Sequence, residues 1–207
     1  LPTGELILMH DDKIDRISNS KGYVRDKTFA ELRALVLEHD QKVLTLEEAL
    51  EFIDKRVPVT IELKNAGSAK PTAELVTEFI QDRGWKPEMF LVSSFNQIEI
   101  AEFKKLMPSV KTGALISGVP VDYAAFAERA GADIAIVDDE LLSKEYVDDA
   151  HARGLEIYVY SFFHDDVDRV ARVKSLGADG MYVNFADKAR EAIAREARAI
   201  MEVADAA

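Results

Sequence analysis

The sequence predicts an α/β fold built on one parallel sheet, with a (β/α)8 TIM barrel favoured over an open, doubly wound sheet. Apolar runs rich in β-branched residues alternate along the chain with stretches of helical periodicity, which indicates helical crossovers between parallel strands. A helix–glycine–strand junction recurs at Gly131, Gly154 and Gly177. No glycine-rich phosphate loop or dinucleotide fingerprint is present, which weakens the open-sheet alternative.

The strands are predicted from apolar runs, several of them continuous rather than alternating. Continuous runs are typical of strands that are buried on both faces, as in a barrel covered by helices. The expected strands cover residues 4–11, 57–64, 89–95, 110–116, 133–137, 156–162 and 179–184.

The helices are predicted from apolar spacing and from residues that begin and end helices. Thr45 with Glu48 three residues later forms a capping-box pattern, and Asn96 and Ser143 are expected N-caps. The expected helices cover residues 45–55, 71–83, 96–106, 121–130, 143–153, 166–176 and 187–203.

Length and composition indicate one domain over residues 1–207. A chain of 207 residues with 48% apolar residues can bury a substantial core, and no apolar stretch is long enough to span a membrane. The net charge of -12 argues against a nucleic-acid surface and against binding to anionic lipid. The absence of cysteine excludes disulfides and thiol catalysis and fits a reducing compartment. A cytoplasmic location is therefore favoured, with periplasm or secretion left open.

Several polar and aromatic side chains fall at or near the carboxyl ends of predicted strands. They include His10, Glu62, Lys64, Phe95 and Tyr160. In a parallel barrel the active site lies at these strand ends, so their common position is the main reason to expect an enzyme. Glu62 and Lys64 are two residues apart and therefore share one face of their strand.

Each candidate also has an ordinary structural interpretation. His10 could transfer protons at neutral pH, or simply form a hydrogen bond with Asp11. A buried Glu62 could be an oxygen ligand of a divalent cation, Mg²⁺ or Ca²⁺, or could form an ion pair with Lys64. Lys64 could contact a phosphate oxygen or remain solvated.

The remaining aromatic and histidine candidates are weaker. Phe95 and Tyr160 are either core residues or rings presented to substrate at the barrel mouth. His39 falls in a polar loop, and His151 on a helix is expected to be solvated. His164 follows a strand and could face the site.

Three segments carry a resemblance to a known family. Residues 5–32 (ELILMHDDKIDRISNSKGYVRDKTFAEL), residues 43–50 (VLTLEEAL) and residues 61–64 (IELK) stand in the order and spacing of the glycerophosphodiester phosphodiesterases. Weaker similarities follow at residues 91–95, 112–115, 158–162 and 178–184. The chain thus resembles this family over nearly its whole length, and the resemblance implies a barrel similar to the phosphatidylinositol phospholipases C.

The resemblance implies a reaction and a role for each matching residue. The reaction is metal-assisted hydrolysis of a glycerophosphodiester to glycerol 3-phosphate and an alcohol, in which one histidine activates the nucleophile and another protonates the leaving alkoxide. By resemblance, His10 is the second of the two catalytic histidines, and Glu62 is one of three carboxylate ligands of a divalent cation, Mg²⁺ or Ca²⁺. Lys64 would contact the scissile phosphate. Phe95 and Tyr160 are expected to contact substrate because of their strand-end positions.

The sequence also departs from the family pattern. The family's first histidine, in a His-Arg-Gly motif, and its other two metal ligands, in a Glu-x-Asp motif, lie upstream of the His10 segment and have no counterpart in this sequence. We therefore expect a barrel that lacks its first two strands, with an upstream segment absent from the sequence. A true truncation completed by another chain, or a degenerate inactive barrel, are the alternatives. The 207-residue chain alone is expected to be nearly inactive.

Two other functions remain open at this point. One is a lysophospholipase D-like or sphingomyelinase D-like activity on lipid phosphodiesters, which would require an apolar loop near the barrel mouth; residues 162–164 are the candidate. The other is a non-catalytic barrel, in which Glu62 and Lys64 should pair with each other. The expected partner is a small glycerophosphodiester, without nucleic acid or a stable membrane anchor, and homo-oligomerisation is left open.

Overall fold

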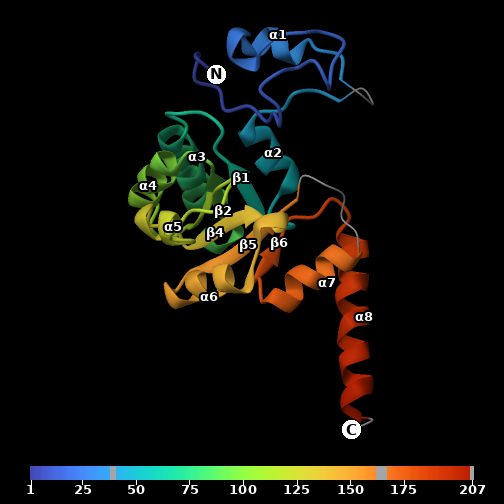
Figure 1. The fold of residues 1–207 in the computed structure, drawn as a ribbon. Helices are drawn as coiled ribbons and strands as arrows, with labels where there is room; N and C mark the ends of the chain where they lie inside the picture. Colours follow the sequence, from blue (N-terminus) through green and yellow to red (C-terminus); the bar gives the residue numbers. More distant parts are fainter. Residues whose placement is uncertain (38–40, 162–166, 206–207) are drawn as a thin grey trace.

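The computed structural model describes residues 1–37, 41–161 and 167–205, and shows an α/β fold with a single curled sheet (Figure 1). The strands are β1 (Val59–Glu62), β2 (Phe90–Ser94), β3 (Lys111–Leu115), β4 (Ile134–Asp138), β5 (Glu156–Tyr160) and β6 (Gly180–Met181). The helices are α1 (Phe29–Arg33), α2 (Leu46–Ile53), α3 (Ala69–Asp82), α4 (Gln97–Leu106), α5 (Ala125–Arg129), α6 (Lys144–Ala152), α7 (Val167–Leu176) and α8 (Ala186–Asp205). Short 3-10 turns are η1 (Val24–Asp26), η3 (Pro87–Met89) and η4 (Asp139–Leu141).

The strand order follows the chain without reversal. The described sheet has six strands in the order β1-β2-β3-β4-β5-β6, and every neighbouring pair is parallel. A doubly wound sheet would reverse direction at a switch point, whereas a barrel adds each strand beside the previous one. The described strands form a curled part of a barrel, as Figure 1 shows, and a closed barrel of eight strands is not seen.

The inner face of the sheet carries its own apolar layer. Leu115, Ile134 and Ile136 are buried there, with Leu91, Tyr158, Tyr160 and Tyr182 packed against them. Because Gly113 and Gly180 have no side chains, the neighbouring side chains of Ile136 and Tyr158 fit within this layer. A Cβ added at Gly180 would lie 2.9 Å from the Tyr158 ring, and one at Gly113 would overlap the Cδ1 atom of Ile136.

The outer face packs against the helices in two clusters. One joins β3, β4 and β5 to α5, α6 and α7 and includes the buried residues Ala135, Val137, Ile157 and Tyr146. The other joins β1 and β2 to α2, α3 and α4 around Trp85, whose indole stacks on Phe90 with ring centroids 4.9 Å apart. Both faces are buried over most of the sheet, which explains why the sequences of the strands are continuous apolar runs.

The predicted helix ends are confirmed. Thr45 and Glu48 form the capping box of α2, while the side chains of Asn96 and Ser143 cap α4 and α6. The junction glycines Gly131, Gly154 and Gly177 adopt left-handed backbone conformations, with φ of 67°, 74° and 94°.

Two of these junctions also carry an aspartate that binds the neighbouring strand. Asp133 Oδ2 accepts a hydrogen bond from the Thr112 backbone N–H at 2.7 Å, and Asp179 Oδ2 accepts one from the Ile157 N–H at 2.9 Å. The aspartate of each Gly-Ala-Asp sequence therefore connects the amino ends of two adjacent strands by a hydrogen bond, which explains why glycine and aspartate recur at this spacing.

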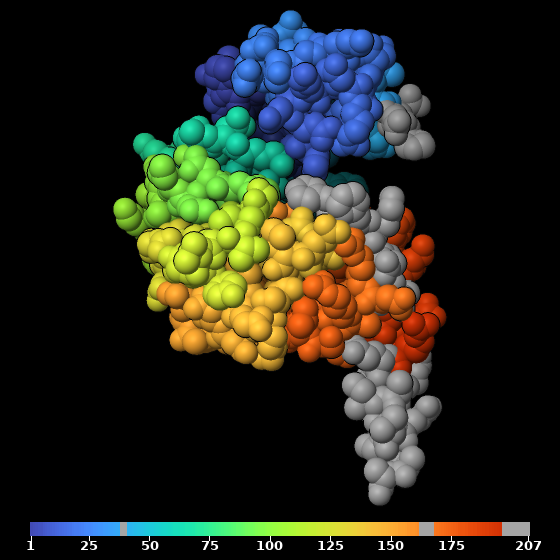
Figure 2. Space-filling view, in the orientation of Figure 1, coloured from blue at the N-terminus to red at the C-terminus, as the bar shows by residue number. Residues whose placement is uncertain are grey.

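The prediction of a strand at residues 4–11 is wrong. This segment belongs to an N-terminal lobe (residues 1–37 and 41–44), where its only strand-like pairing among the described residues is an isolated antiparallel bridge between Ile7 and Thr45. Its apolar side chains belong to two different clusters. Leu6 packs against the cluster around Trp85, while Ile7 and Met9 pack around the lobe's own core at Ile14. Figure 2 shows the lobe, in blue, as a distinct mass above the sheet domain.

Other elements differ from the predictions in their bounds. The last strand is limited to Gly180–Met181 instead of residues 179–184, and the helix expected at 121–130 is limited to Ala125–Arg129. Helix α3 begins at Ala69 rather than Pro71 because a distant carboxylate, described below, accepts hydrogen bonds at its start.

The tight fit at Gly113 leads to a stability prediction. Gly113→Ala should lower the free energy of unfolding by about 1–3 kcal/mol, because the added methyl group overpacks the inner layer against Ile136. Combining it with Ile136→Val, which removes the overlapping methyl group, should cost less than the sum of the two single changes. Urea unfolding of the three variants measures this, and strict additivity would contradict the proposed contact.

Candidate active site

Four of the five predicted site residues lie on the inner face at the carboxyl ends of the strands. Glu62 is in register with Ser93, and Lys64 and Phe95 follow two residues beyond these on the same face. Tyr160 ends β5 in register with Asp138. His10 instead lies in the N-terminal lobe. In Figure 1 this lobe stands on the side of the sheet where the loop after β1 emerges.

Glu62 and Lys64 form an ion pair, with 3.0 Å between Lys64 Nζ and Glu62 Oε1. Their side chains are 32% and 29% exposed, so the carboxylate is less buried than its apolar neighbours in the sequence suggested. The side chain faces the hollow of the curled sheet rather than the helices. This is the pairing left open by the sequence, and it gives Lys64 a defined position beside the strand end.

The backbone between these two residues is fixed by β2. The Leu63 N–H donates to Ser93 O at 2.7 Å, and the Ser94 hydroxyl donates to Leu63 O at 2.6 Å. Ser94 is completely buried, and its Oγ also accepts from the Asn96 N–H at 2.9 Å. The end of β1 is therefore held by hydrogen bonds beyond the regular ladder.

A further residue, which the sequence analysis missed, holds the loop that follows Lys64. Glu99 on α4 is only 3% exposed, and its two oxygens accept hydrogen bonds from the backbone N–H groups of Gly67 and Ala69, each at 2.7 Å. These groups lie at the start of α3, where a carboxylate is favoured by the unsatisfied N–H groups and the helix dipole. The only sequence signal was an acid in the first turn of α4, which is ordinary for a helix.

Phe95 and Tyr160 meet on the inner face. Their ring centroids are 5.8 Å apart in an edge-to-face arrangement, and the Tyr160 hydroxyl donates to Ile116 O at 2.9 Å. Burial, with the nearby charges of Asp138 and Glu62, raises the pKa of Tyr160 to about 12. The phenol thus stays protonated and keeps donating to Ile116 O at neutral pH.

His10 is held by an acidic neighbour rather than by the sheet. Its Nδ1 lies 2.7 Å from Asp11 Oδ1, and Asp11 Oδ2 accepts from Arg16 Nε at 2.7 Å. Hydrogen bonds from Arg16 and then His10 hold the pKa of Asp11 well below its ordinary value of 3.8. The arrangement orients the imidazole through Nδ1, with its side chain 82% exposed.

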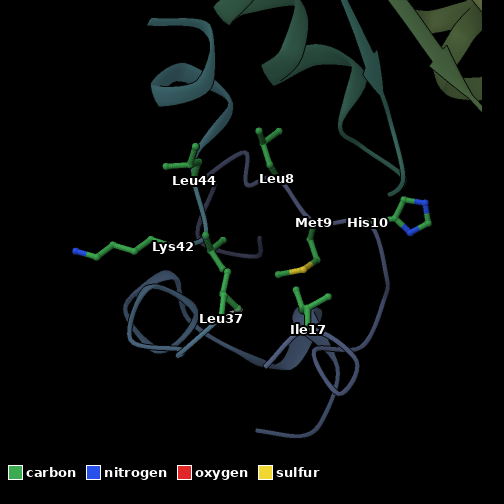
Figure 3. A pocket seen from close by; sticks show the side chains of 8 residues that line it. Leu8, Met9, His10, Ile17, Leu37, Lys42 and Leu44 are labelled. Carbon is green, nitrogen blue, oxygen red and sulfur yellow. The ribbon is translucent and has the colours of Figure 1, made fainter. Parts of the chain in front are cut away.

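An apolar hollow of about 290 Å³ lies beside His10 in the N-terminal lobe (Figure 3). Its lining is Leu8, Met9, His10, Ile17, Leu37, Lys42, Val43 and Leu44. In Figure 3 the imidazole of His10 extends away from the other labelled side chains, so the ring stands at the rim of the hollow rather than inside it.

The described residues do not fit a complete divalent-cation site. Nowhere in residues 1–37, 41–161 and 167–205 do three or more histidine or acidic side chains gather in a way that could hold a metal ion. The Glu62 carboxylate forms its ion pair with Lys64. Mg²⁺ and Ca²⁺ need several oxygen ligands, which a single paired carboxylate does not supply.

Of the other histidines, only His151 lies within the described residues, and it takes no part in this arrangement. His151, expected to be solvated, has its Nε2 2.9 Å from Asp179 Oδ2 at the opposite end of the strands. His39 and His164, with the apolar candidate loop at 162–164, lie outside the described residues.

Comparison with known proteins decides the family. The model of the glycerophosphoryl diester phosphodiesterase family matches residues 3–188, which includes the N-terminal lobe except its first two residues and all six described strands. The chain belongs to this family. The match also shows that the lobe carrying His10 is part of the family pattern and not an unrelated extension.

Two relatives extend beyond the part that matches this chain. A glycerophosphodiester phosphodiesterase of Bacillus altitudinis is 30% identical over 204 residues, covering 90% of this chain and 80% of the relative. A glycerophosphodiester phosphodiesterase of Bacillus subtilis is 26% identical, covering 89% of this chain and 70% of the relative. Part of each relative thus has no counterpart in the chain.

Solved structures support the fold. An Oleispira antarctica phosphodiesterase in complex with the product sn-glycerol-3-phosphate has a TM-score of 0.79 and 24% identity, covering 92% of this chain and 80% of that one. A glycerophosphodiester phosphodiesterase described from Galdieria sulphuraria has a TM-score of 0.78 and 22% identity, covering 91% and 80%. At these identities the likeness establishes architecture alone.

The hydrogen bonds around Asp11 lead to a titration prediction. In Arg16→Met the pKa of Asp11 should rise toward 3.8, because the largest stabilising partner of the carboxylate is lost. A folded-state pKa below the unfolded one contributes stability above the unfolded pKa that is lost as pH falls, so this variant should lose less stability on acidification. NMR titration of the Asp11 carboxyl carbon measures the shift; an unchanged pKa would refute the role of Arg16.

Proposed function

We propose that this protein hydrolyses glycerophosphodiesters to glycerol 3-phosphate and an alcohol. The observation that carries the proposal is membership of the glycerophosphoryl diester phosphodiesterase family over residues 3–188. The positions of Lys64, Glu62, Phe95 and Tyr160 at the carboxyl ends of parallel strands support it, since substrates of such sheets bind at this edge.

In this proposal Lys64 binds the phosphate of the substrate. The overall charge of -12 repels a phosphodiester, so a local positive group is needed to hold it. The ammonium of Lys64 lies at the end of β1 and is held there by Glu62 and by the fixed backbone of Leu63. A phosphate oxygen would replace or share the contact with Glu62.

His10 transfers a proton in the proposed reaction. Water adds its oxygen to phosphorus and the bond from phosphorus to the oxygen of the departing alcohol breaks. Overall, one proton of the water passes to the departing alkoxide, and the other stays on the new phosphate oxygen or goes to solvent. The contact of Nδ1 with Asp11 leaves Nε2 as the ring nitrogen for this exchange. Asp11 thereby acts as a positioning residue for the imidazole.

The metal requirement is part of the proposal, with Glu62 as one oxygen ligand of Mg²⁺ or Ca²⁺. Such an ion would neutralise charge on the phosphate. The described residues supply only part of a ligand set for such an ion.

The first test measures glycerol 3-phosphate release from glycerophosphocholine and glycerophosphoethanolamine by the complete natural protein. His10→Ala should lower kcat/KM by about 100-fold or more, the usual contribution of a proton-transfer group. His151→Ala is the matched control, because His151 also contacts an aspartate through one ring nitrogen but lies at the other end of the strands. Equal loss in both variants, or no turnover by the folded wild-type protein, would refute the proposal.

A second test concerns the metal. Turnover by the complete natural protein should stop when a chelator removes divalent cations and should return with Mg²⁺ or Ca²⁺. The 207-residue chain alone should show almost no turnover, and its unfolding midpoint should not rise with either ion, since Glu62 is paired with Lys64. Strong metal-dependent turnover by the 207-residue chain would contradict this expectation. A non-catalytic barrel, by contrast, predicts no turnover even from the complete protein.

A lysophospholipase D-like activity is the second candidate, favoured by the apolar hollow beside His10. Such a hollow could take the start of an acyl chain. In the described part of the chain no helix has the length and apolar character to cross a membrane. Faster release of choline from lysophosphatidylcholine than from glycerophosphocholine would favour this candidate, and the reverse order would favour the first.

A further inference from the structure

Asp138 stands among the proposed substrate contacts but has no role in the sequence-based predictions. It ends β4, and its register partner on β5 is Tyr160, so both side chains belong to the inner face at the carboxyl edge of the sheet. Its Oδ1 accepts a hydrogen bond from the Glu140 N–H at 2.9 Å, which fixes the carboxylate at the start of η4. Asp138 is half-buried and thus accessible from the mouth.

Two aromatic rings border the same region. The Tyr160 side chain reaches from β5 over β4 to the carbonyl of Ile116, the residue after β3. Phe95, at the end of β2, meets the Tyr160 ring edge to face and remains 42% exposed. The negative face of an aromatic ring and a carboxylate both attract a cation, and together they favour an alkylammonium group.

The charges around the mouth leave Asp138 without a cationic partner in the described structure. Glu62 is neutralised by Lys64, and Arg169 contacts both Asp139 and Glu140. Among residues 1–37, 41–161 and 167–205, no lysine, arginine or histidine nitrogen lies within 4.0 Å of an Asp138 oxygen. Both Asp138 and Glu62 raise the pKa of Tyr160, which indicates that the phenol lies near both carboxylates.

The segment that carries Asp138 is firmly held. Asp139 is fully buried, with Arg169 Nε 3.1 Å from its Oδ2. Arg172 Nη1 donates to Asp139 O at 2.8 Å, and its Nη2 donates to Leu142 O at 3.0 Å. These contacts tie the end of β4 to α7, so the Asp138 carboxylate is presented by a rigid backbone.

We propose that Asp138, Phe95 and Tyr160 form a subsite for the ammonium group of the substrate's alcohol, as in ethanolamine or choline. The assignment rests on the proposed function and adds to it a preference among glycerophosphodiesters. With the phosphate at Lys64 on β1, the alcohol arm runs along the mouth past Phe95 toward Asp138. Substrates with a cationic alcohol are then favoured over those with a neutral polyol such as glycerol or inositol.

The experiment measures binding, so that it does not depend on turnover. Choline and its neutral isostere 3,3-dimethylbutan-1-ol are titrated separately into the complete natural protein, and the ring signals of Phe95 and Tyr160 are followed by NMR. Choline should bind about fivefold or more tightly than the isostere, the range of a modest cation–π and carboxylate contribution. Equal binding of the two compounds, or no shift of either ring signal with choline, would overturn the proposal.

Variants assign the preference to the subsite. Asp138→Asn keeps the oxygen that accepts from Glu140 N–H but removes the charge, and it should bring the two affinities to within about twofold. Phe95→Leu, which leaves Asp138 unchanged, should also reduce the preference. The control is Asp148→Asn, which removes an exposed carboxylate paired with Lys144 on α6 and should leave the ratio as in the wild type. An unchanged ratio in Asp138→Asn would overturn the proposal.

The outcome is separable from that of the proposed function. Loss of glycerol 3-phosphate release with retained choline preference would refute the reaction but not the subsite. Release of glycerol 3-phosphate at equal kcat/KM from glycerophosphocholine and glycerophosphoglycerol would refute the subsite but not the reaction.

Discussion

The register of the parallel strands is the constraint on which the candidate site depends. Side chains alternate between the two faces with a period of two, so a slip of one residue would move Glu62 and Lys64 to the helix-covered face. Several contacts oppose such a slip at β1 and β2. The buried Ser94 hydroxyl donates to Leu63 O, and the Leu63 N–H donates to Ser93 O. Both backbone groups of Leu63, which lies between Glu62 and Lys64, are therefore hydrogen-bonded to β2.

Buried carboxylates fix the loops that follow the strands. Glu99 accepts two backbone N–H groups after β1, and Asp139 pairs with Arg169 after β4. Burying a carboxylate is costly unless it is paired or hydrogen-bonded. Burial raises the pKa of Asp139, while the guanidinium of Arg169 acts in the opposite direction. For Glu99 the cost of desolvation is offset by two hydrogen bonds from the start of α3, whereas for Asp139 the ion pair with Arg169 offsets only part of this cost.

Local signals predicted the parts of the fold that depend on local interactions. The capping box at Thr45 and the left-handed glycines after the helices involve residues only a few positions apart, so they are readable in the sequence. The strand predicted around His10 failed because its apolar residues serve two different clusters, which a run of apolar letters does not reveal. Glu99 was missed for the related reason that its partners lie about thirty positions away along the chain.

The candidate site was predictable to the same extent. Strand-end position identified Glu62, Lys64, Phe95 and Tyr160, because the period of two and the parallel topology together place them at one edge. Whether Glu62 faces a cation or Lys64 could not be decided from spacing, since both arrangements use the same face of β1. The ion pair is visible only in the three-dimensional structure, where it holds the Lys64 ammonium at the end of β1.

Tyr160 shows how one side chain can connect these features. In this chain the hydroxyl binds Ile116 O at 2.9 Å, which holds the ring across β4 and beside Asp138. With its pKa raised to about 12, the phenol remains a donor at any physiological pH. The hydrogen bond to Ile116 O, the edge-to-face contact with Phe95 and the packing against the inner apolar layer together hold the ring between the Phe95 and Asp138 ends of the mouth.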